Sequence, residues 1–305
     1  MRAIIMAAAG AAALFSTPAL SQGTGATPDF SGIWAHPTIP GFEPPASGPG
    51  PVLNKSRFLD GPQIGRSSVN QFVGDYANPI LKPQAAEAVK KHGEIELSGD
   101  VAPTPSNQCW PQPLPYIFWN MGMQMLQQSD KITILYDGDH EVRHVRMNEP
   151  HPAQVTPSWY GNSVGHYVGD TLVIDTVGVK TRRSFAVVDW FGTPYTEALH
   201  VVERYRLLDY EAAKEGLERD AKENFRAGMA PWRIDPNYRG KHLQLQFTVE
   251  DEGVFTTPWS ATITYGPGFD GRGAAEWPEL VCAENLRATW VTKDSAVPRA
   301  DKPDF

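Results

Sequence analysis

The sequence predicts a mainly β protein, built as an antiparallel barrel or sandwich, with a closed barrel as the preferred form. Residues 242–251 and 259–265 alternate apolar and polar side chains, which is typical of strands with one buried face. A third run, residues 159–176, is interrupted by Gly169 and Asp170, a pair typical of a two-residue hairpin turn. Successive short strands of this kind indicate a barrel or a sandwich.

The turn of this hairpin fixes its register, because a two-residue turn leaves one way to pair the strands. Counted outward from the turn, His166 lies opposite Val173 and Val164 lies opposite Asp175. His166 and Asp175 therefore share a face as diagonal neighbours, within side-chain reach of each other. We predict a polar pair of an imidazole and a carboxylate on this face.

The remaining elements follow from local patterns along the chain. Residues 36–115 are rich in Pro and Gly and are expected to be mostly irregular, apart from a short helix at 84–91 that Pro83 begins. Residues 210–225 are rich in Ala, Glu, Lys and Arg and predict a longer helix. Further strands are expected at residues 29–34, at 132–136 and 142–147 on either side of an Asp-Gly turn, and at 200–207.

Residues 1–21 carry the pattern of an export signal. Arg2 supplies a positive start, residues 3–15 are apolar, and residues 19–21 form a small-x-small cleavage site. The apolar run is too short for a membrane span, which needs about 18 residues. We expect residues 22–305 to be one exported domain, periplasmic or else secreted; a retained N-terminal anchor is the alternative.

The formal net charge of −8 argues against nucleic acid and anionic membranes as partners, since both are bound through basic patches. A small apolar or aromatic molecule is the expected partner, and a homodimer is left open. Cys109 and Cys282 are the two cysteines, and in an oxidising compartment we expect them to form a disulfide, with two free thiols as the alternative. Neither cysteine lies in a nucleophile motif.

Neither a metal nor a cofactor is expected from the motifs. The eight histidines include no His-Glu-x-x-His pattern, although a site assembled from distant residues stays open. His140 and His144 are four apart, but on strand or turn rather than on one helix face. Phosphate-binding glycine loops, dinucleotide fingerprints and Gly-x-Ser-x-Gly elbows do not occur.

Glu203 is the first candidate for acid/base chemistry. In residues 200–207 the face that contains Val201, Glu203, Tyr205 and Leu207 is the more apolar and should point inward. Burial of a carboxylate raises its pKa, which suits a general acid or base near neutral pH. The alternative is an ion pair between Glu203 and an arginine that braces the barrel.

Other candidates are spread along the chain. His151 is flanked by two prolines that would hold it rigidly, a placement that suits proton transfer, and an exposed loop histidine is the alternative. His200 and Tyr160 have side chains suited to the same chemistry. Asp189 lies in a turn that could place it at a cavity mouth. Five aromatic residues could line a cavity for a flat ligand, although core packing is the default for each of them: Trp119, Trp159, Tyr167, Trp190 and Tyr205.

Several segments carry a resemblance to known proteins: residues 30–34, 163–176, 200–205, 255–259 and 282–285. Over nearly all of its mature length the chain resembles a large family of exported bacterial proteins, common in sphingomonads and mostly without assigned function. The resemblance implies a lipocalin-like (calycin-like) barrel with long loops and one or two peripheral helices. The chain is also similar to a formaldehyde-releasing lyase that acts on phenylcoumaran-type dimers, from which no catalytic residue can be carried over.

Three functions remain open at this point. The first is a cofactor-independent lyase or isomerase that acts on an aromatic or apolar small molecule. It predicts that Glu203→Gln removes turnover and leaves the fold intact. The second is a lipocalin-like carrier, in which the polar groups of the cavity satisfy one another. The third is a structural protein of the cell envelope.

Overall fold

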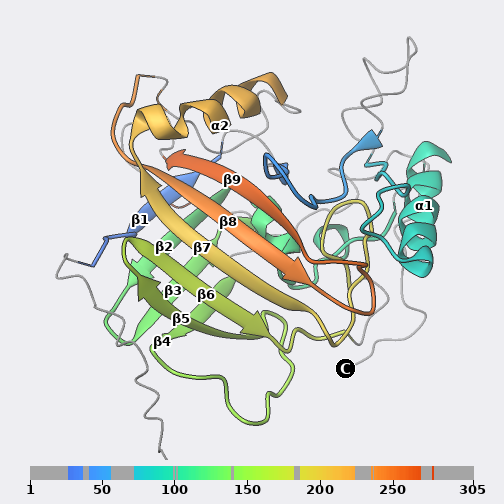
Figure 1. Ribbon diagram of the computed structural model, residues 1–305, viewed down its shortest axis with the longest axis horizontal. Coiled ribbons are helices and arrows are strands. Elements are labelled where there is room, and N and C mark those ends of the chain that lie inside the picture. The colour runs from blue at the N-terminus through green and yellow to red at the C-terminus, as the bar shows by residue number, and fades with distance from the viewer. Residues whose placement is uncertain are drawn as a thin grey trace, which may run out of the picture.

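The computed structural model describes residues 27–36, 41–55, 72–98, 100, 102–138, 141–181, 186–223, 235, 237–268 and 277. Within this part of the chain, nine strands form a closed barrel with two α-helices outside it (Figure 1). The strands are β1 (Gly32–Ala35), β2 (Gly122–Gln127), β3 (Lys131–Tyr136), β4 (Val142–Met147), β5 (Asn162–Val168), β6 (Thr171–Val177), β7 (His200–Leu208), β8 (His242–Glu250) and β9 (Trp259–Pro267). The helices are α1 (Pro83–Ser98) and α2 (Tyr210–Glu223), with short 3-10 turns at Ser106–Gln108 and Tyr116–Trp119.

The barrel follows the order of the chain, and each strand pairs with its sequence neighbours. All neighbouring pairs are antiparallel except β4 and β5, which are parallel. A ring with an odd number of strands cannot alternate direction all the way round, so one parallel pair is required. A parallel pair needs a crossover of about a dozen residues or more, and residues 148–161 provide it. The mainly β barrel is thus confirmed, with this one departure from the expected antiparallel pairing.

The closing seam between β1 and β9 is short. These strands share two residue pairs, Trp34 with Pro267 and Ala35 with Gly266. Further along β9, Thr262 exchanges backbone hydrogen bonds with Glu43 in both directions, and Ser260 donates to the carbonyl of Pro49. The segment after β1 therefore covers an edge that would otherwise present unpaired backbone groups.

The β5–β6 hairpin has the predicted register. Val164 pairs with Asp175, His166 pairs with Val173, and Val168 pairs with Thr171. The turn residue Gly169 has a φ of 61°, a left-handed conformation that glycine adopts without steric cost. The two-residue turn and its register are confirmed.

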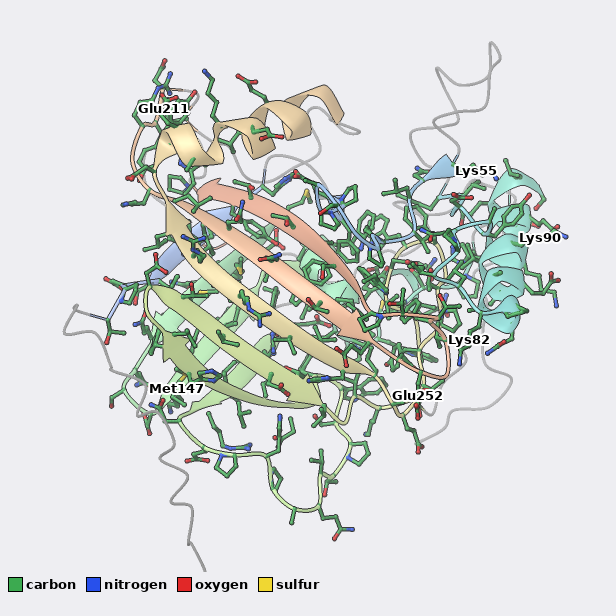
Figure 2. The ribbon with its side chains drawn as sticks, in the orientation of Figure 1. Lys55, Lys82, Lys90, Met147, Glu211 and Glu252 are labelled. Carbon is green, nitrogen blue, oxygen red and sulfur yellow. The ribbon has the colours of Figure 1, made fainter. Side chains whose placement is uncertain are left out.

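Alternate residues of the strands face the barrel interior, as the patterns predicted. On β8 the buried residues Leu243, Leu245, Phe247 and Val249 point inward, together with Trp259, Ala261, Ile263 and Tyr265 on β9. On β7 the fully buried residues are Val201, Glu203 and Tyr205, so the inward face expected for this strand is confirmed. Charged side chains on the helices, such as Lys90 and Glu211, lie on the outside of the molecule (Figure 2).

β2 was not predicted from the sequence, and α1 is longer than predicted. β2 contains Gly, Met, Gln and Leu but no β-branched residue, so its composition gives no strand signal. α1 begins at Pro83 as predicted but continues to Ser98, past the expected end near residue 91. In the described part of the chain no helix is long and apolar enough to cross a bilayer. The export signal and Cys282 lie outside the described residues, so the cleavage site and the disulfide with Cys109 stay predictions.

Candidate functional site

An ion pair lies inside the barrel between β4 and β7. Arg143 Nη2 lies 2.6 Å from Glu203 Oε1 and Arg143 Nη1 lies 2.9 Å from Glu203 Oε2. The Arg143 side chain is 1% exposed and that of Glu203 is 0% exposed. Two parallel hydrogen bonds of this kind are the strongest geometry for a guanidinium and a carboxylate. We call these two residues the interior pair.

Hydroxyl groups complete the hydrogen bonding of the interior pair. Ser163 Oγ accepts from Arg143 Nε and Nη2 at 3.1 and 3.0 Å, and Thr176 Oγ1 accepts from Nη2 at 2.8 Å. The Tyr205 hydroxyl donates to Glu203 Oε2 at 2.8 Å, and burial raises the pKa of Tyr205 well above its ordinary value. Burial opposes the charge of Arg143, but the carboxylate of Glu203 outweighs this effect and the pKa of Arg143 is raised.

This network supports the bracing alternative for Glu203. Both carboxylate oxygens bond Arg143, and one also accepts from Tyr205, so the group is held by protein partners on each side. A catalytic role for Glu203 stays a prediction. Arg143 was not singled out in the sequence, although alternation along β4 places it on the same face as the buried Val145 and Met147. An arginine on an otherwise apolar strand face was the feature of the sequence that could have indicated a buried ion pair.

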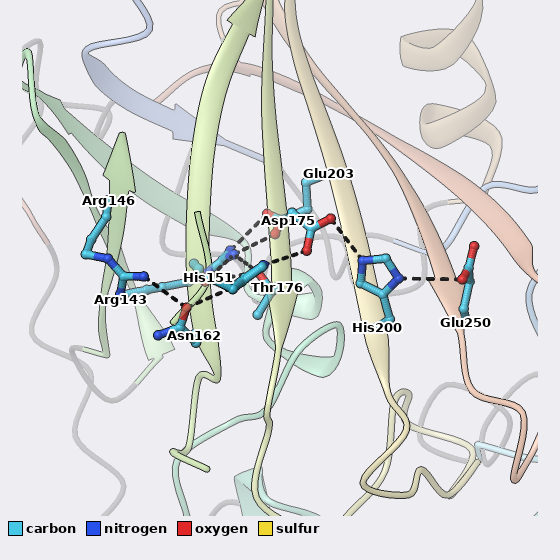
Figure 3. Close-up of polar contacts among 10 residues, drawn as sticks. Arg143, Arg146, His151, Asn162, Asp175, Thr176, His200, Glu203 and Glu250 are labelled. Carbon is cyan, nitrogen blue, oxygen red and sulfur yellow. Dashed lines mark hydrogen bonds and ion pairs between the residues drawn. The ribbon is translucent and has the colours of Figure 1, made fainter. Parts of the chain in front are cut away.

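A second polar group lies on the outer wall of the same strands (Figure 3). Asp175 accepts hydrogen bonds from two imidazoles, with His151 Nε2 at 2.8 Å from Oδ1 and His200 Nε2 at 3.0 Å from Oδ2. The other nitrogen of His151, Nδ1, lies 2.8 Å from Asn162 Oδ1. We call His151, Asn162, Asp175 and His200 the wall site. It brings together two of the predicted catalytic residues, which lie far apart in sequence.

Strand register explains how the wall site forms. Asp175 pairs with Val202, and Val177 pairs with His200, so His200 is a diagonal neighbour of Asp175 on the outer face. His151 arrives from the β4–β5 crossover, which returns over the outside of the barrel to reach Asn162 at the start of β5. The rare parallel pair is therefore what carries this histidine to the wall.

The predicted pair of His166 and Asp175 is not formed. Both residues have the expected register, but His166 is exposed, and Asp175 bonds His151 and His200 instead. His166 lies on β5 opposite Val173, and His200 lies on β7 opposite Val177. The two histidines are therefore diagonal neighbours of Asp175 on its two flanking strands. Register alone does not distinguish the two histidines, and both carboxylate oxygens of Asp175 are bonded to His151 and His200.

The wall site is half-buried and electrostatically coupled. The side chains of His151, Asp175 and His200 are 25%, 34% and 31% exposed. The hydrogen bond from His200 is the main cause that lowers the pKa of Asp175, and the hydrogen bond to Asp175 is the main cause that raises the pKa of His200. Burial acts in the opposite direction on both groups. Each partner therefore stabilises the charged form of the other.

Both ring nitrogens of His151 have hydrogen-bond partners. Arg146 Nη2 donates to Asn162 Oδ1 at 3.1 Å, which fixes this amide oxygen as an acceptor toward His151 Nδ1. With Asp175 at Nε2, His151 is therefore held from both sides of its ring. His200 differs, because its Nδ1 lies 3.5 Å from Glu250 Oε2, a longer contact.

Three further predicted residues lie in or next to an aromatic cluster at the turn of residues 189–192: Trp119, Asp189 and Trp190. The rings of Trp119 and Trp190 are stacked, with centroids 5.6 Å apart. Asp189 Oδ1 accepts from the backbone N–H groups of Phe191 and Thr193 at 2.9 and 3.1 Å. Burial raises the pKa of Asp189 to about 6. We call Phe72, Tyr116, Trp119, Trp190 and Phe191 the Trp190 cluster.

The other aromatic candidates do not join this cluster. Tyr205 belongs to the interior network, and Tyr167 stacks on Phe30 with centroids 6.5 Å apart. Trp159 is half-buried beneath the ammonium of Lys180, which lies 5.2 Å from its ring centroid, and Tyr160 is half-buried beside it in sequence. The predicted site residues are thus distributed among the barrel interior, the outer wall, the Trp190 cluster and the segment before β5.

Among the described residues, no group of three or more His, Cys, Asp and Glu side chains could hold a metal ion. In the wall site the imidazole nitrogens point at the carboxylate itself and not at a common point. His140 lies outside the described residues.

Comparisons with protein-family models, with curated proteins and with solved structures found no match for this chain. The resemblance to exported sphingomonad proteins therefore rests on the sequence motifs, and the closed barrel is the part of it that the structure supports.

Proposed function

We propose that this protein is an acid/base enzyme, a lyase or isomerase, whose proton-transfer groups are the imidazoles of the wall site. The observation that carries the proposal is a single carboxylate, Asp175, that holds two half-exposed histidines. Orientation of an imidazole by a carboxylate is the arrangement that proton-transfer catalysis requires. Placement on strands adds the rigidity that such a site needs.

His200 is the residue assigned to transfer the proton. Its Nε2 is held by Asp175, whereas among the described residues its Nδ1 has only the 3.5 Å contact to Glu250, so a substrate can approach Nδ1 with little competition. Asp175 stabilises the imidazolium that forms when His200 accepts a proton. His151 has both nitrogens engaged and acts as a positioning residue that fixes Asp175.

The substrate class proposed is an aromatic small molecule. Trp159 and Tyr160 immediately precede the strand that begins with Asn162, and both are half-buried, so they can offer flat surface beside the wall site. For a phenylcoumaran-type dimer, neutral His200 would remove the proton of the hydroxymethyl group. The carbon–carbon bond then breaks to release formaldehyde, its electron pair forms a carbon–carbon double bond, and the phenolic carbon–oxygen bond opens. The imidazolium returns the proton to the phenolate oxygen, so the reaction is redox-neutral.

The test is incubation of the mature protein with a panel of aromatic dimers, followed by mass spectrometry of the small molecules. A product lighter by one formaldehyde identifies the lyase, and an isomer with altered chromatographic retention identifies an isomerase. His200→Gln should abolish this product, while His166→Gln should not, because His166 is an exposed histidine of the same barrel wall without a bond to Asp175. Equal turnover in both variants would remove the wall site from the proposal.

A carrier of apolar ligands is the second candidate, and the interior pair favours it. Its charges and hydroxyls satisfy one another, as expected of a barrel that holds ligands without reacting with them. In the same experiment, dimers that stay bound to the protein and return unaltered would identify the carrier. Either function is proposed for the periplasm or the extracellular space, after removal of residues 1–21.

A further inference from the structure

Two polar atoms, one in the Trp190 cluster and one next to it, are buried and have no hydrogen-bond partner among the described residues. They are Nε1 of Trp119 and Nε2 of His92. Trp119 is 6% exposed, so water has little access to its indole N–H. An unmet buried donor or acceptor costs about 1–3 kcal/mol. Such atoms are exceptions in folded proteins, so each of them calls for an explanation.

The two groups differ in what they offer. Burial lowers the pKa of His92 to about 4, so its imidazole is neutral, while a hydrogen bond to the backbone of Trp190 acts in the opposite direction. Since Nε2 has no partner among the described residues, the hydrogen bond to the Trp190 backbone uses Nδ1. Nδ1 also lies close to the turn at residues 189–192, because a Cβ added to Gly192 would overlap it. Nδ1 therefore carries the proton and Nε2 presents a lone pair. Trp119 presents an N–H, which can only donate.

The rings around these atoms favour a flat ligand. Trp119 and Trp190 are stacked within 18° of parallel, and Phe72 meets Trp190 edge-on with centroids 4.7 Å apart. Phe72 and Trp190 are half-buried, so the cluster is open to solvent on their side, whereas Trp119 is buried. Offset stacking on such rings adds binding energy beyond the area that is buried.

Electrostatics favour a neutral ligand over an anion. Asp189 is buried beneath the cluster, and burial first and then the charge of Asp189 raise the pKa of the neighbouring Tyr116. A phenolate in this position would meet the same penalty. A neutral phenol would not, because it carries no charge to desolvate.

We propose that the Trp190 cluster, together with His92, binds a neutral phenolic molecule. The phenol donates its hydroxyl proton to His92 Nε2, an oxygen lone pair accepts from Trp119 Nε1–H, and the ring lies against Trp190. This site is separate from the wall site and does not depend on catalysis there. Its donor is Trp119 Nε1–H, its acceptor is His92 Nε2, and its aromatic surface is Trp190.

The test is isothermal titration of the mature protein with p-cresol and with its methyl ether, 4-methylanisole, which has the same ring but no hydroxyl proton. The wild-type protein should bind p-cresol about tenfold more tightly than 4-methylanisole, as one buried hydrogen bond allows. His92→Leu should remove this preference, and Trp119→Phe should weaken p-cresol about tenfold while it keeps the aromatic ring.

Two controls keep the result interpretable. His92→Asn retains an acceptor and should retain part of the preference, which separates loss of the lone pair from damage to the fold. His144→Leu changes an exposed histidine outside the cluster and should leave affinity unchanged. Equal affinity for the two probes, no binding of p-cresol at millimolar concentration, or the same loss of preference in His144→Leu would each overturn the proposal. Since His200→Gln should bind p-cresol normally, failure of this site and failure of the wall site can be told apart.

Discussion

Arg143 and Glu203 bond each other through both ends of their planar groups, at 2.6 and 2.9 Å, across the inside of the barrel. The two residues come from β4 and β7, which are not neighbours in the sheet. The pair therefore joins walls that backbone hydrogen bonds do not connect directly. Its value to stability depends on both members being present, because either charge alone would be buried without compensation.

Glu203→Gln is expected to destabilise the fold by about 3–5 kcal/mol, since it leaves the Arg143 guanidinium buried without a counter-charge. Urea denaturation monitored by tryptophan fluorescence measures the change. Glu252→Gln, at an exposed position, is the matched control and should change stability little. Equal stability of the Glu203 and Glu252 variants would contradict the bracing role.

Replacement of both members together should be far less harmful than replacement of one. The double variant Arg143→Met with Glu203→Leu has no buried charge at either position. Such apolar replacements of buried ion pairs often leave the free energy of unfolding unchanged or raise it by about 1–4 kcal/mol. The double variant should therefore unfold at a higher urea concentration than Glu203→Gln. A double variant less stable than the single one would show that the surrounding hydroxyls, left without partners, dominate the energetics.

Asp175→Asn should lower the pKa of His200, because the hydrogen bond to this carboxylate is the largest cause of the raised value. The measurement is a pH titration of the imidazole Cε1–H resonances by NMR. His166, which does not bond Asp175, supplies an internal control in the same spectra. A His200 titration that is unchanged in the variant would mean that Glu250, the other acid partner of His200, sets its protonation.

Stability should depend on pH through the wall site in a defined window. The pKa of Asp175 is lowered from 3.8, so its contribution is complete above 3.8 and is lost as pH falls through the folded-state value. The pKa of His200 is raised from 6.5, so its contribution is complete below 6.5 and is lost as pH rises through the folded-state value. The stability difference between wild type and Asp175→Asn should therefore be largest between pH 3.8 and 6.5. A difference that keeps growing above this range would refute the assignment.

Gly192→Ala should destabilise the turn beside the Trp190 cluster by more than the cost of backbone conformation alone. Gly192 has a φ of 75°, and an added Cβ would overlap His92 Nδ1. Gly169→Ala is the control, since Gly169 has a φ of 61° with nothing within 4 Å of an added Cβ. The left-handed conformation costs about 1–2 kcal/mol in each variant. Thermal unfolding should show the larger loss for Gly192→Ala, and equal losses would mean that His92 moves aside freely.

The parts of the structure that could be predicted from sequence are those that local patterns determine. Alternation identified the inward faces of β7, β8 and β9, and a two-residue turn determined the whole register of β5 and β6. β2 was missed because it lacks β-branched residues, and its place is set by pairing with β1 and β3.

The candidate site was only partly predictable for a different reason. His151, Asp175 and His200 were each identified as candidates, but their meeting depends on the pairing of β6 with β7 and on the path of the β4–β5 crossover. Neither is visible in a local pattern. The sequence instead favoured His166, which has an equivalent diagonal position on β5 but does not bond Asp175.

Asp175 and Thr176 are consecutive residues of β6, yet one belongs to the wall site and the other bonds Arg143 inside the barrel. The pleat of one strand thus places two different structural roles at adjacent positions in the chain. Under the proposed function, substitutions at Thr176 should act on folding alone, whereas substitutions at Asp175 should also act on proton transfer at the surface. A lineage of such barrels can therefore diversify what happens on its outer wall while the inward-facing residues that keep the barrel folded stay the same.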